Sequence, residues 1–152
     1  MTAFLLSIHV LAAIVLIGPI TVAASLFPRY ARAEVAEPGS GNVGVVHALH
    51  RISSGYAVAA VAVPVFGIAT AVQLGVLTDV WLLASMALTV VAAVLLGLAI
   101  LPAQRRVIAA LDESSPVAAL LSRLAMWTGM FSLTWAVVVV LMIVRPGSTT
   151  GT

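Results

Sequence analysis

The chain has 152 residues, of which 62% are hydrophobic and 8% charged, and its mean hydropathy is +1.21. Soluble domains are about 45–50% apolar and about 25% charged, and a small globule cannot bury so large an apolar excess, so a soluble enzyme and a disordered chain are excluded. The absence of cysteine excludes a disulfide-rich secreted module. The seven basic residues are scattered arginines, which argues against a nucleic-acid partner.

Four windows are long and apolar enough to cross a bilayer as helices, which takes about 20 residues. They are residues 3–27, 52–77, 81–101 and 126–144, and none contains Asp, Glu, Lys or Arg. Because backbone polar groups in lipid must be satisfied within the segment, each window is expected to be helical. The first lacks the basic start and short apolar core of a signal peptide, so we interpret it as a span. The sequence therefore predicts an all-α, polytopic, single-domain membrane protein, a four-helix bundle followed by a tail at 145–152.

The arginines predict how the helices are oriented. Six of the seven lie in the connections 28–51 and 102–125, and the remaining one is Arg145. Loops rich in arginine stay on the cytoplasmic side of a membrane. We therefore expect a multi-pass protein of the bacterial cytoplasmic membrane, with both termini outside. Trp81 and Trp127 fall near span ends, the level that indole rings prefer.

The two arginine-bearing connections resemble each other. Residues match at a constant offset of 74, among them Pro28 and Pro102, Arg32 and Arg106, and Gly55 and Gly129. This pattern predicts two parallel copies of one helical hairpin, a known way to build membrane bundles. The alternative is chance agreement between two apolar hairpins.

His9 is an ionisable side chain placed well inside a span. Such residues usually face the bundle interior and mark functional sites. The functional interpretations are that His9 binds haem or a metal ion, or relays protons. A haem on His9 would take Met142 or Met86, from the same half of the membrane, as a second ligand. His50 lies near the other surface, so it cannot share one haem with His9. The alternative is a neutral histidine that forms a hydrogen bond to another helix.

His47 and His50 are three residues apart and share one face of a helix. They are candidate metal ligands, but a zinc site needs at least one more protein ligand. Glu34 or Glu37 could fold back to supply it. The alternative is a pair of interfacial polar residues beside Arg51.

Prolines and glycines predict where helices bend or touch. We expect interruptions at Gly18-Pro19 and Pro64, and we expect the first and third helices to end or bend at Pro28 and Pro102. Small residues allow close helix approach, which is predicted at Gly55, Gly67, Gly97 and Gly129. Interrupted helices can also line a substrate site, so a small transporter is a further alternative, although few polar side chains are present to line it.

The stretch HVLAAIVLIGPITVAASLFPRYAR at 9–32, with LHR at 49–51 and the four-span layout, resembles a bacterial family of predicted integral membrane proteins of unknown function. More remotely, His9 with Pro28 and Arg29 is similar to the copper-resistance D type of membrane protein and to the HemJ-type protoporphyrinogen oxidases. That similarity implies haem b at His9. The HemJ type also uses an intramembrane lysine, which this chain lacks. The resemblance therefore implies haem binding without the oxidase reaction.

Besides the small transporter, the sequence is consistent with two other functions. The first is a small haem-binding membrane protein. The second is a non-catalytic accessory subunit or homo-oligomer that packs against a larger membrane complex. The chain has no nucleotide-binding or hydrolase motif and no paired carboxylates within its spans, so an enzyme is disfavoured.

Overall fold

The computed structural model describes residues 2–147, and all their regular elements are helical; the last five residues of the predicted tail lie outside this range. The first span joins α1 (Thr2–Ala12), the π-helical turn η1 (Ala13–Ile17) and α2 (Gly18–Ala36). The second joins α3 (Asn42–Ala59) and α4 (Ala62–Leu74). The third joins α5 (Val80–Val94), the π-helical turn η2 (Leu95–Ile100) and α6 (Leu101–Asp112), and the fourth is α7 (Ala118–Val144). Each span is long and apolar enough to cross a membrane, which confirms the predicted all-α, four-helix class.

Two helices extend further than the sequence predicted. The first continues through Pro28 to Ala36, and the third continues through Pro102 to Asp112, so neither helix ends at its proline. The alternative, that they bend there, stays a prediction. Proline removes one backbone donor, but the bonds of the flanking turns keep the helix intact. The residues that follow are mostly alanine, arginine and other helix formers, so the helix continues beyond the apolar window.

Irregular turns lie next to three prolines. The π-helical turn η1 directly precedes Gly18 and Pro19, and η2 is followed by Pro102 after one further residue. A turn at residues 60–61 separates α3 from α4 just before Pro64. Because proline cannot donate to the preceding turn, local rearrangements of this kind let the freed carbonyls find other partners. The interruptions predicted at Pro19 and Pro64 are therefore confirmed.

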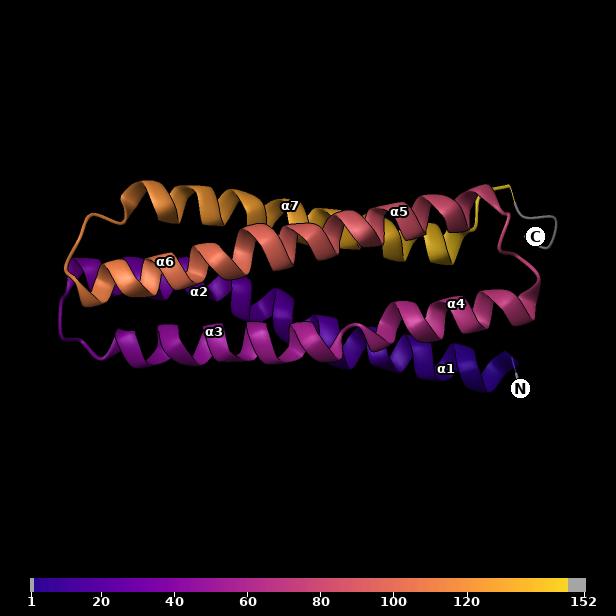
Figure 1. The fold of residues 1–152 in the computed structure, drawn as a ribbon, viewed down its shortest axis with the longest axis horizontal. Coiled ribbons are helices and arrows are strands. Elements are labelled where there is room, and N and C mark those ends of the chain that lie inside the picture. The colour runs from indigo at the N-terminus through magenta and orange to yellow at the C-terminus, as the bar shows by residue number, and fades with distance from the viewer. Residues whose placement is uncertain (1, 148–152) are drawn as a thin grey trace.

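The four spans pack as two hairpins that lie side by side (Figure 1). In the first hairpin α2 packs along α3 and α1 along α4, and in the second α5 and α6 pack on α7. Between the hairpins, the close contacts are those of α2 with α7 and with α6, and of α3 with α6. Whether the hairpins descend from one duplicated unit stays a prediction.

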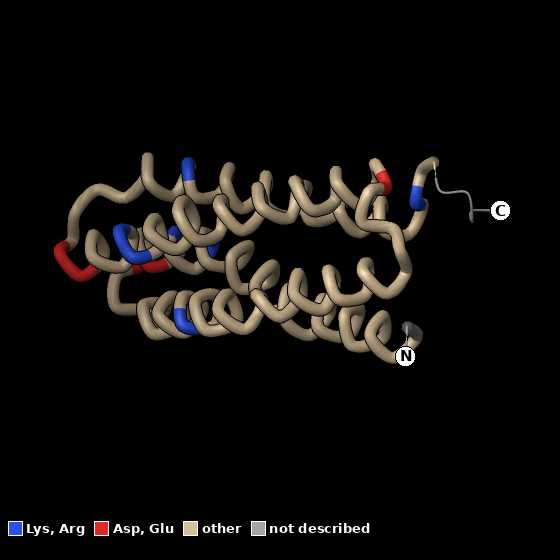
Figure 2. Tube along the Cα trace, turned by 45° about the vertical axis from the view of Figure 1, so that its right-hand side comes forward, with Lys and Arg blue, Asp and Glu red and all other residues tan. Residues whose placement is uncertain are grey.

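Charged residues gather toward the two ends of the bundle and leave its middle uncharged (Figure 2). Loops 37–41 and 113–117 lie together at one end, with six of the seven arginines in the adjoining half. We call this half the arginine half. The N-terminus, loop 75–79 and the end of α7 lie in the other half, which we call the terminal half.

In the terminal half, Trp81 contacts two charged side chains. The indole N–H of Trp81 donates to the Asp79 carboxylate at 3.0 Å, and the Arg145 guanidinium lies 5.5 Å from the centroid of the ring. The first contact is a hydrogen bond and the second is a cation–π interaction. Together they join loop 75–79 to the end of α7.

The hydrophobic core is concentrated in the arginine half. Side chains from all four spans are fully buried there, namely Ala24, Phe27, Ala31, Val46, Ile100, Val107 and Leu124. In the terminal half there is a smaller cluster of Ala71, Trp81 and Leu82, against which Val76, Met86 and Met142 pack. We call this the terminal cluster.

Candidate functional site

His9 lies on α1 and is directed at α4. Its Nδ1 atom is 2.9 Å from the carbonyl oxygen of Val63, and the side chain retains 8% exposure. A carbonyl oxygen only accepts hydrogen bonds, so Nδ1 carries the proton and donates it. In the neutral ring with this tautomer, the other nitrogen, Nε2, is the one with the lone pair.

The start of α4 is shaped to receive this ring. The helix begins at Ala62, directly after the turn at residues 60–61, and Val63 presents its carbonyl in the first turn. One turn later Gly67 leaves room for the imidazole, because a Cβ atom built there would lie 2.9 Å from Cε1 and 3.2 Å from Nδ1 of His9. Contacts this short exclude any larger residue at 67 unless the ring moves.

Only one of the four glycines expected at helix contacts is closely approached. Gly67 packs on His9, whereas a Cβ atom added to Gly55, Gly97 or Gly129 would have no heavy atom of a neighbouring element within 4 Å. The prediction of close approach at these three glycines is wrong. They lie on open faces of their helices, which periodicity alone did not distinguish from the packed faces.

Met86 and Met142 both pack against the terminal cluster. That cluster includes Ala71, which lies four residues beyond Gly67 on α4, or about 6 Å along the helix axis. The structure therefore places the histidine and the two methionines in the same half of the bundle and at neighbouring depths. The polar contact of His9 is with Val63, and the methionine contacts are with the cluster around Trp81.

A second buried polar group links the two hairpins in the arginine half. Gln104 of α6 is fully buried, its Oε1 accepts a hydrogen bond from Nδ1 of His50 at 2.9 Å, and its Nε2 donates to the Ser53 hydroxyl at 3.5 Å. His50 precedes Val63 by 13 residues, about 20 Å along the helix. His9 and His50 therefore belong to separate sites, as their positions in the sequence indicated.

Gln104 was not predicted as a site residue because it lies in the connection 102–125, outside the predicted spans. A signal was present. Ile100, Ala103, Gln104 and Val107 follow the spacing of one helical face, and all four are buried. A glutamine within an otherwise apolar face predicts a buried hydrogen bond between helices.

His47 and His50, the candidate metal ligands, lie in different surroundings. His50 is half-buried and bonded to Gln104, whereas His47, one turn earlier on α3, is exposed. Neither Glu34 nor Glu37 joins them. Across residues 2–147 no three His, Asp or Glu side chains are close enough to hold a metal ion together.

Glu34 instead closes the loop between α2 and α3. Its carboxylate accepts hydrogen bonds from the Gly39 N–H at 2.8 Å, the Ser40 hydroxyl at 3.1 Å and the Val43 N–H at 3.3 Å. From Ala3 to Ala36 the first span has 34 residues and is about 51 Å long, which exceeds the hydrocarbon core of about 30 Å. Its last turn, which carries Glu34 and follows the apolar window 3–27, therefore lies outside that core. The Gly39 N–H is the main reason that the pKa of Glu34 is lowered, the other bonds add to it, and burial opposes it.

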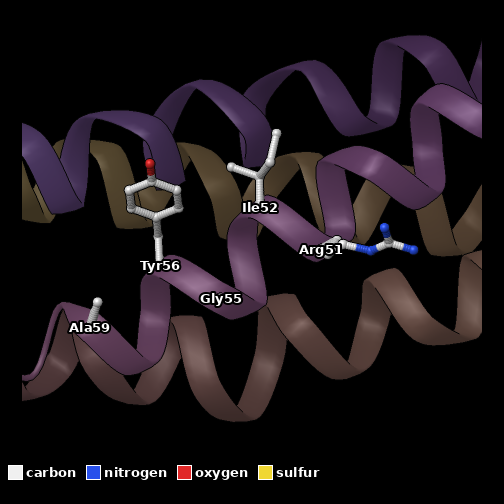
Figure 3. Close-up of a pocket in the computed structure, with 5 residues that line it drawn as sticks. All are labelled: Arg51, Ile52, Gly55, Tyr56 and Ala59. Carbon is white, nitrogen blue, oxygen red and sulfur yellow. The ribbon is translucent and has the colours of Figure 1, made fainter.

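Two pockets lie on the surface of the bundle. One, of about 310 Å³, follows the outward face of α3 and is lined by Arg51, Ile52, Gly55, Tyr56 and Ala59 (Figure 3). The other, of about 540 Å³, lies between the end of α2 and the start of α7 and includes Arg32, Ser115 and Ser122. Neither of these two pockets touches His9.

Comparison of the chain with protein-family models, with curated proteins and with solved structures finds no match. The resemblances stated for the sequence therefore stay predictions, and the function rests on the geometry.

Proposed function

We propose that this protein is a small multi-pass membrane protein that binds haem b in its terminal half, with His9 as the residue that would hold the iron. The observation that carries the proposal is the hydrogen bond from Nδ1 of His9 to the Val63 carbonyl. Histidines that bind metals almost always donate their other ring N–H to a carbonyl or carboxylate, which fixes the tautomer and the ring orientation. In His9 this arrangement leaves Nε2 for the iron.

The surroundings of His9 support this assignment. The terminal half is apolar, and its methionines, Met86 and Met142, lie on the other hairpin at a neighbouring depth. A thioether opposite a histidine is a known haem ligand pair. When bound, haem supplies one-electron chemistry, while His9 orients it and the apolar side chains exclude water. In the bacterial cytoplasmic membrane, with both termini outside, the site would lie toward the outer surface.

The test is the absorbance spectrum of the protein, purified in mild detergent and titrated with haem. We expect a Soret band in the wild type, its loss in His9→Ala, and its retention in the control His47→Ala, because His47 is exposed in the other half. A shifted reduced spectrum in Met142→Ala or Met86→Ala would identify the second ligand. A folded, helical wild type that shows no Soret band at saturating haem contradicts the proposal.

A second candidate function is that of an accessory subunit or homo-oligomer without a cofactor. The observation that favours it is the exposed outer surface of α1 and η1, where Phe4, Leu11 and Ile14 are 67%, 60% and 65% exposed. In a membrane either lipid or another helix covers such side chains. Purification in mild detergent distinguishes the two candidates, since a monomer without a bound partner argues against this one.

A further inference from the structure

The groove on α3 combines one charge with an apolar floor (Figure 3). Gly55 and Ala59 are four residues apart and form its open floor, Ile52 and Tyr56 line it, and Arg51 stands at the side of the arginine half. The groove has a volume of about 310 Å³. No heavy atom of a neighbouring element lies within 4 Å of the place where a Gly55 Cβ would be.

The groove faces away from the bundle. Val46, Leu49 and Ser53 are the buried residues of α3, and they lie on the opposite side of the helix from Gly55 and Ala59, which are exposed. The surface around the groove therefore meets the surrounding medium rather than another part of this chain.

The depth of the groove matches the boundary of a membrane. Arg51 is the last charged residue before the apolar window 52–77, so it stands where hydrocarbon gives way to headgroups. From Arg51 to Ala59 the groove runs eight residues along the helix, or about 12 Å into the apolar region. One end of the groove is thus suited to a charged group and the rest to an aliphatic chain.

The charge around the groove is positive. None of the residues that line it is acidic. The hydrogen bond between His50 and Gln104 holds α3 and α6 at the same level, so Arg51 and the exposed Arg105, which follow these two residues, lie at similar depth. Arg51 is therefore the charged side chain that an anion in the groove meets, and Arg105 adds positive charge at the same depth.

We propose that the groove binds one anionic phospholipid, with its phosphate on Arg51 and an acyl chain over Gly55 and Ala59. Basic residues beside a membrane surface attract anionic lipids, and the small residues leave the space that the chain occupies. The ring of Tyr56 has an apolar face and a hydroxyl, which suits the boundary between headgroup and chain.

A second copy of this chain is the competing occupant, because small residues four apart also form contacts between membrane helices. In a twofold dimer the same patch meets itself. Two copies of α3 joined through Gly55 would bring their Arg51 side chains together, with no acidic residue in the groove to pair with them. The charge therefore favours a phosphate over a second α3.

The test counts the lipids retained by the purified protein. Wild type, Arg51→Gln and Gly55→Leu are reconstituted into vesicles of equal parts phosphatidylglycerol and phosphatidylcholine with identical acyl chains, extracted in mild detergent and analysed by mass spectrometry. The matched controls are Arg123→Gln, an exposed arginine of the same half, and Gly129→Leu, an exposed glycine of α7 with open space around it.

We expect the wild type to retain phosphatidylglycerol in preference to phosphatidylcholine. Arg51→Gln should lower that preference about fivefold, the weight of one basic residue near an anionic surface. Gly55→Leu should lose the retained lipid, and both controls should match the wild type. Equal preference in the wild type and Arg51→Gln overturns the proposal. So does a wild-type dimer that Gly55→Leu converts to a monomer, because the groove is then a contact between copies.

Discussion

In the arginine half, all four spans contribute fully buried side chains to one core, and Gln104 joins the two hairpins through His50 and Ser53. In the terminal half, the hydrogen bond of His9 stays within the first hairpin, and the cluster around Trp81 that bridges the two is small. Helix association in lipid depends on close packing and interhelical hydrogen bonds rather than on the hydrophobic effect. The arginine half should therefore contribute most of the free energy of unfolding. The helices of the terminal half, which holds the candidate ligands, are less tightly fixed to one another.

The largest expected effect is that of Phe27→Ala. Phe27 is 0% exposed, so the truncation leaves a cavity in a close-packed core and should lower the free energy of unfolding by roughly 3 kcal/mol. The matched variant is Phe4→Ala, which removes a ring that is 67% exposed in the terminal half and should change stability by less than about 0.5 kcal/mol. Unfolding in mixed micelles measures both. Equal losses would show that the two halves are packed alike.

Gln104→Leu should have the next largest effect. Leucine keeps most of the volume but leaves the His50 imidazole and the Ser53 hydroxyl without their partner, at a cost of about 2 kcal/mol. Because this contact joins the hairpins, crosslinking between single cysteines placed on α3 and α6 should also become slower. Unchanged stability and crosslinking would mean that the apolar core alone holds the hairpins together.

Gly67→Ala tests the corresponding contact in the terminal half. The added Cβ forces the His9 ring away from its position and breaks its bond to Val63, which should cost about 1 kcal/mol, typical of interhelical hydrogen bonds in membranes. The control is Gly129→Ala, where the added atom meets open space. Unfolding gives the energy, and nitrogen NMR of labelled histidine reports the tautomer of His9. A wild-type tautomer in Gly67→Ala would contradict the packing described for this ring.

The smallest effect concerns pH and lies in the loop of the first hairpin. The pKa of Glu34 is lowered in the folded protein, mainly by the Gly39 N–H, so its carboxylate stabilises the fold above the pKa of the unfolded chain. That contribution is lost as the pH falls through the folded pKa. Glu34→Gln should therefore be less stable than the wild type at neutral pH, and the difference should shrink in acid. Thermal unfolding against pH measures this, with the exposed Glu37→Gln as the control that should follow the wild type.

The sequence predicts the spans well because they depend on composition and length, which a membrane constrains strongly. The sequence is less informative about where the helices end. Pro28 and Pro102 lie inside helices that continue to Ala36 and Asp112, because the hydrogen bonds of the turns around each proline keep the helix intact. A proline signals a missing donor, but only the neighbouring structure decides whether the helix ends, bends or changes to a π-helical turn.

Within the candidate site, the sequence singled out His9 but not its partner. The acceptor is a backbone carbonyl next to an interruption, and Pro64 indicates the interruption without indicating which carbonyl faces α1. The hydrogen bonds that Gln104 makes between the hairpins were not predicted, for a different reason. Its recognition depends on whether the helix ends or continues at Pro102, which the proline alone leaves open.

The π-helical turn η1 has a consequence for how the first span can vary. A π-helical turn is an α-helix that has taken up one extra residue, and each residue of an α-helix rotates the chain by about 100°. Because the wider turn absorbs that extra residue, removing one residue from Ala13–Ile17 would restore the regular helix and leave His9 directed at α4. The same deletion in the α-helical stretch between His9 and Ala12 would instead rotate His9 by that angle and take it off α4. The π-helical turn thus gives the first span one place where a residue can be lost without changing which face of α1 meets α4.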